Sequence, residues 1–199
     1  MSLYCLECSK KELDCCREAH AKFTTLKDAR RIADFLQTDV SSFTVYGELN
    51  DKDREEHIYI SRDRGYYYDL TRKDGKLLQL KEKRDGSCMF HDEDGRCRIY
   101  SARLLICRTY PFWFSAKGDI IFDGCSSDCP IVCAVTGNDD PEDVTKIEDD
   151  EGSRLKLALE YIGHTPGLIR EILGQMMDEI EDYRLNIHQF VRDNRIEII

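Results

Sequence analysis

The chain has 199 residues and a formal net charge of −10, from 29 lysine or arginine residues and 39 aspartate or glutamate residues. This length can bury a core without help from a metal ion, so we expect one domain with an appended helical segment. The charge argues against nucleic-acid binding, no apolar run approaches the roughly 18 residues of a membrane span, and the first residues lack a secretory signal. The sequence therefore predicts a soluble cytoplasmic protein that binds neither nucleic acid nor membrane.

Residues 1–24 contain the motif Cys5-x2-Cys8-x6-Cys15-Cys16 among charged residues. Too few apolar residues recur for a separate core, so a metal ion or neighbouring structure must order this segment. Cys-x2-Cys spacing lets two sulfurs converge on one ion, which favours Cys5 and Cys8 as ligands. Adjacent side chains diverge, so Cys15 and Cys16 are equal candidates, and one can ligate while the other serves a second ion, a redox step or the core.

A helix is predicted to begin at Thr24 or Thr25, which supplies a hydroxyl N-cap, with Asp28 in the first turn. Its apolar residues recur at helical spacing. They are Leu26, Ala29, Ile32, Ala33 and Leu36.

Short runs rich in β-branched and aromatic residues then predict strands at 43–46, 57–60, 66–68 and 77–80. The pairs Asp74-Gly75, Asp85-Gly86 and Asp94-Gly95 suit tight turns, because Asp-Gly accepts positive φ. We expect an antiparallel meander with Cys88 and Cys97 on the two arms of its last hairpin.

The length of that hairpin loop decides whether the two thiols can share an ion. A four-residue loop, Asp92 to Gly95, would place Cys97 opposite Phe90 and diagonally across from Cys88, within reach of one metal. A two-residue loop would separate the cysteines by roughly 13 Å. A shared metal therefore predicts the wider loop.

Cys107 precedes an aromatic run, and a short strand is predicted at 120–122. The series Cys125-x3-Cys129-x3-Cys133 follows, and we interpret it as a loop that enters a helix at about Pro130.

The last part of the chain is expected to be helical. Residues 138–152 are strongly acidic and are interpreted as an exposed linker or a solvated helix start. Apolar residues then recur at helical spacing over 155–162 and 169–191, interrupted at Thr165-Pro166-Gly167. This pattern predicts a helical hairpin or one long amphipathic helix.

The ten cysteines suggest what organises the remainder of the fold. Clustered thiols in a cytosolic chain usually hold metal or perform redox chemistry. We predict an α+β fold: a small antiparallel β-meander with metal-organised cysteine loops, an N-terminal helix and C-terminal helices. Its parts are a cysteine-cluster metal-binding domain over residues 1–137, an acidic linker over 138–152, and a C-terminal helical segment over 153–199 packed on the same domain.

The order of these motifs resembles the YkgJ-type cysteine-cluster family. The resemblance rests on the N-terminal motif with its cysteine doublet, on Cys88 and Cys97, and on the block Cys107-Arg108-Thr109-Tyr110-Pro111-Phe112. It covers roughly residues 5–133, with Leu104 where the family usually has proline. The family is described as zinc- or iron-chelating and sometimes as iron–sulfur-containing. The resemblance therefore implies metal binding and no particular reaction.

Thiolate suits zinc, ferrous iron and iron–sulfur clusters. One mononuclear site uses at most four protein ligands, so ten thiols favour two sites, or one site and one cluster. The candidate metal ligands are all ten cysteines: Cys5, Cys8, Cys15, Cys16, Cys88, Cys97, Cys107, Cys125, Cys129 and Cys133.

Other interpretations apply to several of these residues. Cys107 and Cys133 also fit buried, apolar-like positions. His20 and His91 could ligate, but we expect exposed histidines there. Arg103 and Arg108 suit either hydrogen bonds to thiolates or a bound anion, or ordinary pairing with surface acids.

No nucleotide-binding, hydrolase-elbow or zinc-protease motif is present, and the sequence assigns no catalytic residue. Whether the protein is an enzyme stays open. One hypothesis is a zinc- or iron-binding module that acts with a protein partner. The alternative is an iron–sulfur protein in electron transfer or a redox reaction.

Overall fold

The computed structural model describes residues 16–17, 22–49, 51, 54, 74–110, 112–114, 120–122 and 165–199. Its helices are α2 (Leu26–Leu36), α5 (Leu105–Thr109) and α8 (Pro166–Asp193), with 3-10 helices η1 (Val40–Ser42) and η2 (Tyr100–Ala102). The strands are β1 (Thr44–Glu48), β2 (Lys76–Leu80), β3 (Phe112–Phe114) and β4 (Ile120–Phe122). Helices beside antiparallel strand pairs confirm the predicted α+β class.

Helix α2 forms where the sequence predicts it. The Thr25 hydroxyl accepts a hydrogen bond from the Asp28 N–H, which satisfies one amide of the first turn. Leu26, Ala29 and Ile32 are buried on one face. The helix ends at Leu36 and is followed by the C-cap residue Gln37, whose φ of 52° is left-handed.

Strands β1 and β2 form an antiparallel pair in which Tyr46 lies opposite Leu78. Both outer edges of this pair are covered by short segments. Phe23 bridges Gln79 on the β2 side, and Ile198 bridges Tyr46 in parallel on the β1 side. Four segments therefore lie side by side: the strands β1 and β2, and the short segments that contain Phe23 and Ile198.

The predicted meander is wrong in its second half. The Asp-Gly turns after β2 exist, but each is closed by a single bridge, because the chain turns again directly after each cysteine. Strands β3 and β4 form a separate antiparallel pair. The predicted strands at 57–60 and 66–68 lie outside the described residues.

Helix α8 confirms the second of the two predicted helical stretches, the one over residues 169–191. Thr165 caps it by accepting from the Leu168 N–H, and Pro166 occupies its first turn. Its buried residues match the predicted apolar positions and include Ile169, Leu173 and Tyr183. The predicted helical stretch over 155–162 and the acidic linker lie outside the described residues.

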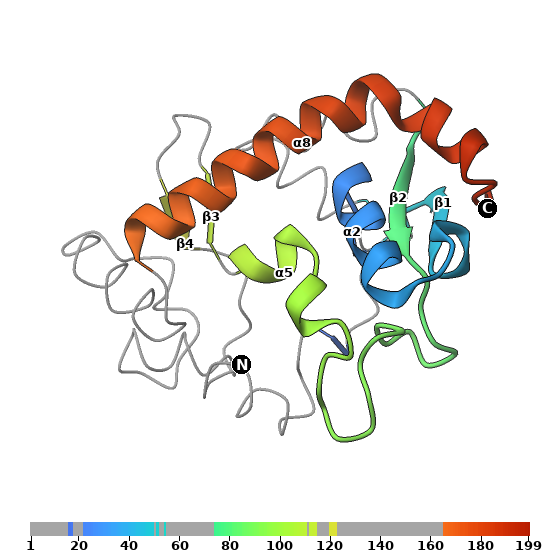
Figure 1. Cartoon of the computed structure of the whole chain (residues 1–199), viewed down its shortest axis with the longest axis horizontal. Coiled ribbons are helices and arrows are strands. Elements are labelled where there is room, and N and C mark those ends of the chain that lie inside the picture. The colour runs from blue at the N-terminus through green and yellow to red at the C-terminus, as the bar shows by residue number, and fades with distance from the viewer. Residues whose placement is uncertain are drawn as a thin grey trace.

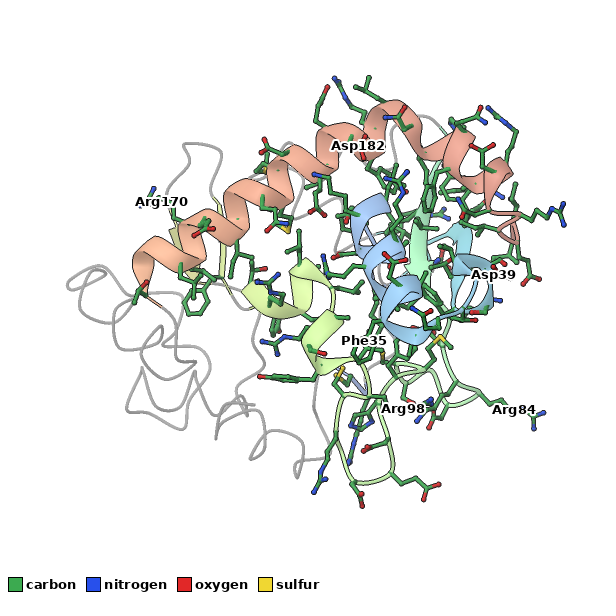
Figure 2. All side chains as sticks on the ribbon, viewed as in Figure 1. Phe35, Asp39, Arg84, Arg98, Arg170 and Asp182 are labelled. Atoms are coloured by element: carbon green, nitrogen blue, oxygen red, sulfur yellow. The ribbon has the colours of Figure 1, made fainter. Side chains whose placement is uncertain are left out.

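Figure 1 shows α8 running along one side of the molecule above α2 and α5, while the chain between β2 and α5 loops out on the opposite side. Helix α8 contacts α2, α5 and β3. Arg170 extends from the outer face of α8, away from α5 (Figure 2). No helix in the described ranges combines the length and the apolar character needed to cross a bilayer.

Candidate metal centre

Four of the ten predicted ligands fall within the described residues: Cys16, Cys88, Cys97 and Cys107. Cys88 is buried, Cys16 and Cys97 are half-buried, and Cys107 is exposed. The other six lie outside the described residues. They are Cys5, Cys8, Cys15, Cys125, Cys129 and Cys133.

The N-terminal cysteine motif contacts the turn that contains Cys88 through a backbone hydrogen bond. The Cys88 N–H donates to the Cys16 carbonyl at 2.7 Å. Cys16 and Cys88 are 72 positions apart in the sequence but are neighbours in the fold. A metal site that combines the N-terminal cysteines with the later cysteines requires such a contact.

Cys88 and Cys97 occupy equivalent places in two successive nine-residue units, 83–91 and 92–100. In each unit an Asp-Gly turn precedes the cysteine, with φ of 81° at Gly86 and 75° at Gly95. Each unit has the same closing hydrogen bond, from the N–H of its first residue to the carbonyl of its fifth, at 2.9 Å. Both cysteines then begin a further tight turn, closed by an N–H three residues later.

The register of the second unit differs from the expected one. His91, not Phe90, lies opposite Cys97. The connection spans residues 92–96, one residue more than predicted, because Arg96 as well as the Asp-Gly pair belongs to the turn: its N–H donates to the Asp92 carboxylate at 2.7 Å. The two-residue loop is excluded, the predicted four-residue loop is one residue too short, and the partner of Cys97 is His91.

Backbone amides point at the sulfurs of Cys88 and Cys97. The N–H groups of Phe90 and His91 hydrogen bond to the Cys88 thiol, and the N–H of Ile99 hydrogen bonds to the Cys97 thiol. Such donors stabilise the thiolate form, the form that binds metal. The tight turns after the cysteines supply these amides.

Burial is nevertheless the largest influence on these thiols. It raises the pKa of Cys88 and raises the pKa of Cys97 to about 11, and the amide hydrogen bonds oppose it. The pKa of Cys107 is also raised, first by the dense protein around its thiol, although the residue keeps exposed surface. Negative charge on Cys16, Cys88 and Cys97 raises it further. The four sulfurs therefore lie close enough to repel one another when ionised, and a bound cation would relieve that repulsion.

Proximity does not by itself complete a ligand shell. Among the described residues, no three histidine, cysteine, aspartate or glutamate side chains form a group that could hold a metal ion. Thiolate sulfur is nevertheless a donor that suits zinc and iron, so the described cysteines can provide part of such a ligand shell.

His91 and Arg103 both lie near the thiols, and only His91 departs from its expected setting. His91 is buried, with 7% of its surface exposed, although it borders an acidic turn. Arg103 is half-buried: its guanidinium lies 4.3 Å from the centre of the Tyr100 ring, and its charge lowers the pKa of Cys97. The expected exposed histidine at position 91 is therefore wrong.

Comparison with protein families now adds to this geometry. The model of the CxxCxxCC family, whose description reads "Putative zinc- or iron-chelating domain", matches residues 4–134. This chain belongs to that family. The matched range holds all ten cysteines and ends before α8. No solved structure matches the chain.

In this CxxCxxCC member, a buried carboxylate that sequence reasoning treated only as a helix-start residue supports the centre. The Asp28 carboxylate accepts from the Leu105 N–H at 3.1 Å and from Arg31. Arg31 also donates to the Arg103 carbonyl at 2.9 Å. Asp28 thereby fixes the start of α5, the helix that carries Cys107. Burial raises the pKa of Asp28 to about 6.

A second buried carboxylate, Glu179, lies outside the family match and was missed from the sequence. It accepts from the Thr25 hydroxyl and from the Gln175 amide at 3.1 Å. Its position three residues after Met176 and one before Ile180, both buried, is the signal that places it on the inner face of α8. Glu179 joins α8 to the start of α2.

Proposed function

We propose that this protein holds a zinc or iron ion through cysteine thiolates from both cysteine groups, with Cys16, Cys88 and Cys97 among the ligands. Membership of a zinc- or iron-chelating family supports metal binding. The observation that carries the residue assignment is the convergence of amide donors on Cys88 and Cys97 beside the backbone of Cys16.

The remaining predicted cysteines, including Cys5, Cys8 and Cys107, are proposed to complete this shell or a second one. A closed thiolate shell leaves no coordination position for a substrate. We therefore propose a metal-binding module that acts with a protein partner. When the ion binds, the thiols release protons, because only the thiolate is a ligand.

Anaerobic purification followed by elemental analysis and absorption spectroscopy tests the proposal. Colourless protein with stoichiometric zinc, or iron without sulfide, supports a thiolate-held ion. Brown protein with iron and acid-labile sulfide supports the iron–sulfur alternative. Protein that binds neither metal would contradict both.

Substitution tests the ligand assignment. Cys8→Ser and Cys97→Ser should each lower bound metal, because loss of one donor opens the shell. The matched control is Leu77→Val in β2, which removes buried apolar volume outside the cysteine turns and keeps every thiol; Leu77 is only 3% exposed. Its metal content per folded molecule should equal that of the parent protein. Unchanged metal in both serine variants would refute the assignment.

Metal removal tests where the ion acts. Under a chelator, amides of residues 81–100 should exchange with solvent faster, while buried amides of α8 keep their protection. Equal acceleration in both regions would show that the ion stabilises the whole fold.

A further inference from the structure

We infer that His91 supplies a nitrogen ligand to the same ion as Cys88 and Cys97, giving the centre a mixed sulfur and nitrogen donor set. The inference rests on the metal site proposed above. It adds a ligand of a different chemical class from the ten predicted cysteines.

The first observation is the turn that joins His91 to Cys88. The His91 N–H donates to the Cys88 carbonyl at 3.0 Å, and the same amide is directed at the Cys88 thiol. A turn closed in this way brings residues i and i+3 side by side. Cys-x2-Cys metal motifs use this spacing, and residues 88–91 form Cys-x2-His.

The second observation is the pairing of His91 with Cys97. The two residues lie directly opposite each other in an antiparallel bridge. The flanking hydrogen bonds are Asp92 N–H to the Arg96 carbonyl at 2.9 Å and Arg98 N–H to the Phe90 carbonyl at 2.8 Å. His91 and Cys97 are therefore a non-hydrogen-bonded pair, whose side chains share one face with Cβ atoms roughly 4.5–5.5 Å apart.

The third observation is a contrast within the nine-residue repeat. Glu82 faces Cys88 as His91 faces Cys97, so positions 82 and 91 are equivalent. Glu82 is exposed and pairs with Lys22 at 3.4 Å. His91 is buried at the equivalent place. The two equivalent positions therefore differ in burial: the acid opposite Cys88 reaches solvent, whereas the imidazole opposite Cys97 is covered by protein.

Figure 2 shows Arg84 extending away from the ribbon of the first turn, in keeping with a charged outer surface on these units. Donors of the two units can instead meet on the face shared by His91 and Cys97. In their present rotamers the described donors do not form a three-residue group, so the inference requires rotation of at least one side chain about its Cα–Cβ bond.

Ligand chemistry favours a histidine nitrogen in place of a fourth cysteine sulfur. Neutral imidazole is an ordinary ligand of zinc and iron, and Cys3His shells are common for zinc. Each thiolate adds a negative charge, and the chain already carries −10. An imidazole in place of a fourth thiolate leaves the centre one charge less negative and reduces repulsion among the sulfurs.

X-ray absorption at the zinc edge of the full-length, zinc-loaded protein tests the inference first, because it requires no variant. We expect both sulfur and nitrogen scattering. The companion experiment measures affinity for Zn²⁺ in His91→Gln, which should fall by about 10–100-fold or more. The matched control is His188→Gln on α8, where the histidine is 42% exposed and lies 3.9 Å from Asp74; its affinity should not change.

A donor-restoring variant guards against simple loss of folding. His91→Cys should retain near-parental affinity, and its Co²⁺ form should gain thiolate-to-cobalt charge-transfer absorption. Zinc bound by sulfur alone, with equal affinities in the two glutamine variants, would overturn the His91 assignment and leave the proposed function intact. Parental protein that binds no metal would instead overturn the proposed function itself.

Discussion

The packed region formed by α2, α8 and the β1–β2 pair is held together differently from the cysteine turns over residues 81–100. In the packed region, buried apolar side chains interlock, among them Leu26, Leu78 and Leu173. In the turns, order comes from backbone hydrogen bonds, two glycines with positive φ, and a few anchors such as Phe90, whose ring lies 5.9 Å from that of Phe43. The packed region can therefore form on apolar burial alone, while the turns supply geometry for an ion.

The two regions meet at buried polar groups. Asp28 receives hydrogen bonds from α5 and Arg31, and Glu179 receives one from Thr25. A substitution at this junction should therefore affect both the packed region and the cysteine turns, whereas a substitution elsewhere should affect only one of the two regions.

The largest expected effect is in the packed region. Leu173→Ala should lower the free energy of unfolding by roughly 2–5 kcal/mol, because Leu173 is fully buried. Metal bound per folded molecule should stay constant. Leu185→Ala, at a site 65% exposed on the same helix, should change stability by less than about 0.5 kcal/mol. Denaturant titration with metal analysis measures both. If the folded fraction of Leu173→Ala bound less metal, the packed region and the metal-binding turns would not be independent of each other.

The junction should make stability depend on pH. The pKa of Asp28 rises from 3.8 to about 6 on folding, so the native state binds this proton more tightly than the unfolded chain. The contribution is complete below pH 3.8 and is lost as the pH rises through about 6, to a total of up to about 3 kcal/mol.

Asp28→Asn should remove this part of the pH dependence, and denaturant titrations of both proteins between pH 4 and pH 7.5 measure the difference. Parallel curves for the variant and the parent protein would show that Asp28 keeps an ordinary pKa in the native state.

A smaller effect is expected at the edge of the sheet. The Leu78 N–H donates to the Tyr183 hydroxyl at 2.8 Å, so the side chain from α8 replaces a strand partner. Tyr183→Phe should cost about 1–3 kcal/mol, because a buried amide loses its acceptor. Thermal unfolding measures the loss. Stability equal to that of the parent protein would mean that the amide finds another acceptor.

The smallest effects should have opposite signs in the two regions. Gly95→Ala should destabilise the second cysteine turn by about 1–2 kcal/mol, because its φ of 75° disfavours a Cβ. Gly174→Ala, within α8, should stabilise the protein by about 0.5–1 kcal/mol, since a Cβ there meets nothing within 4 Å. Only Gly95→Ala should also weaken metal binding. Weaker binding in both variants would show that the regions are coupled.

Sequence reasoning performed unevenly at the candidate site. The Asp-Gly pairs correctly predicted tight turns before Cys88 and Cys97, because Asp-Gly chemistry is local. The prediction that both cysteines lie on the arms of one hairpin is wrong, since Cys88 pairs with Glu82 in the preceding turn. Sequence reasoning also placed Phe90 opposite Cys97 and expected an exposed His91, because one extra loop residue changes the register and the partner. Glu179 was missed, because its partner Thr25 lies 154 residues away in the sequence.

The sequence by itself determined the elements whose signals are local. Thr25 and Thr165 cap α2 and α8, the apolar periodicity of α8 fixes its buried face, and the cysteine pattern marks the family. Tertiary structure alone decided which distant segments meet: Cys16 with Cys88, Ile198 with Tyr46, and Asp28 with Leu105. The physical reason is that capping and periodicity depend on residues within a few positions of each other. Contacts between residues far apart in the sequence depend instead on which buried polar groups lie next to each other after the hydrophobic core has formed.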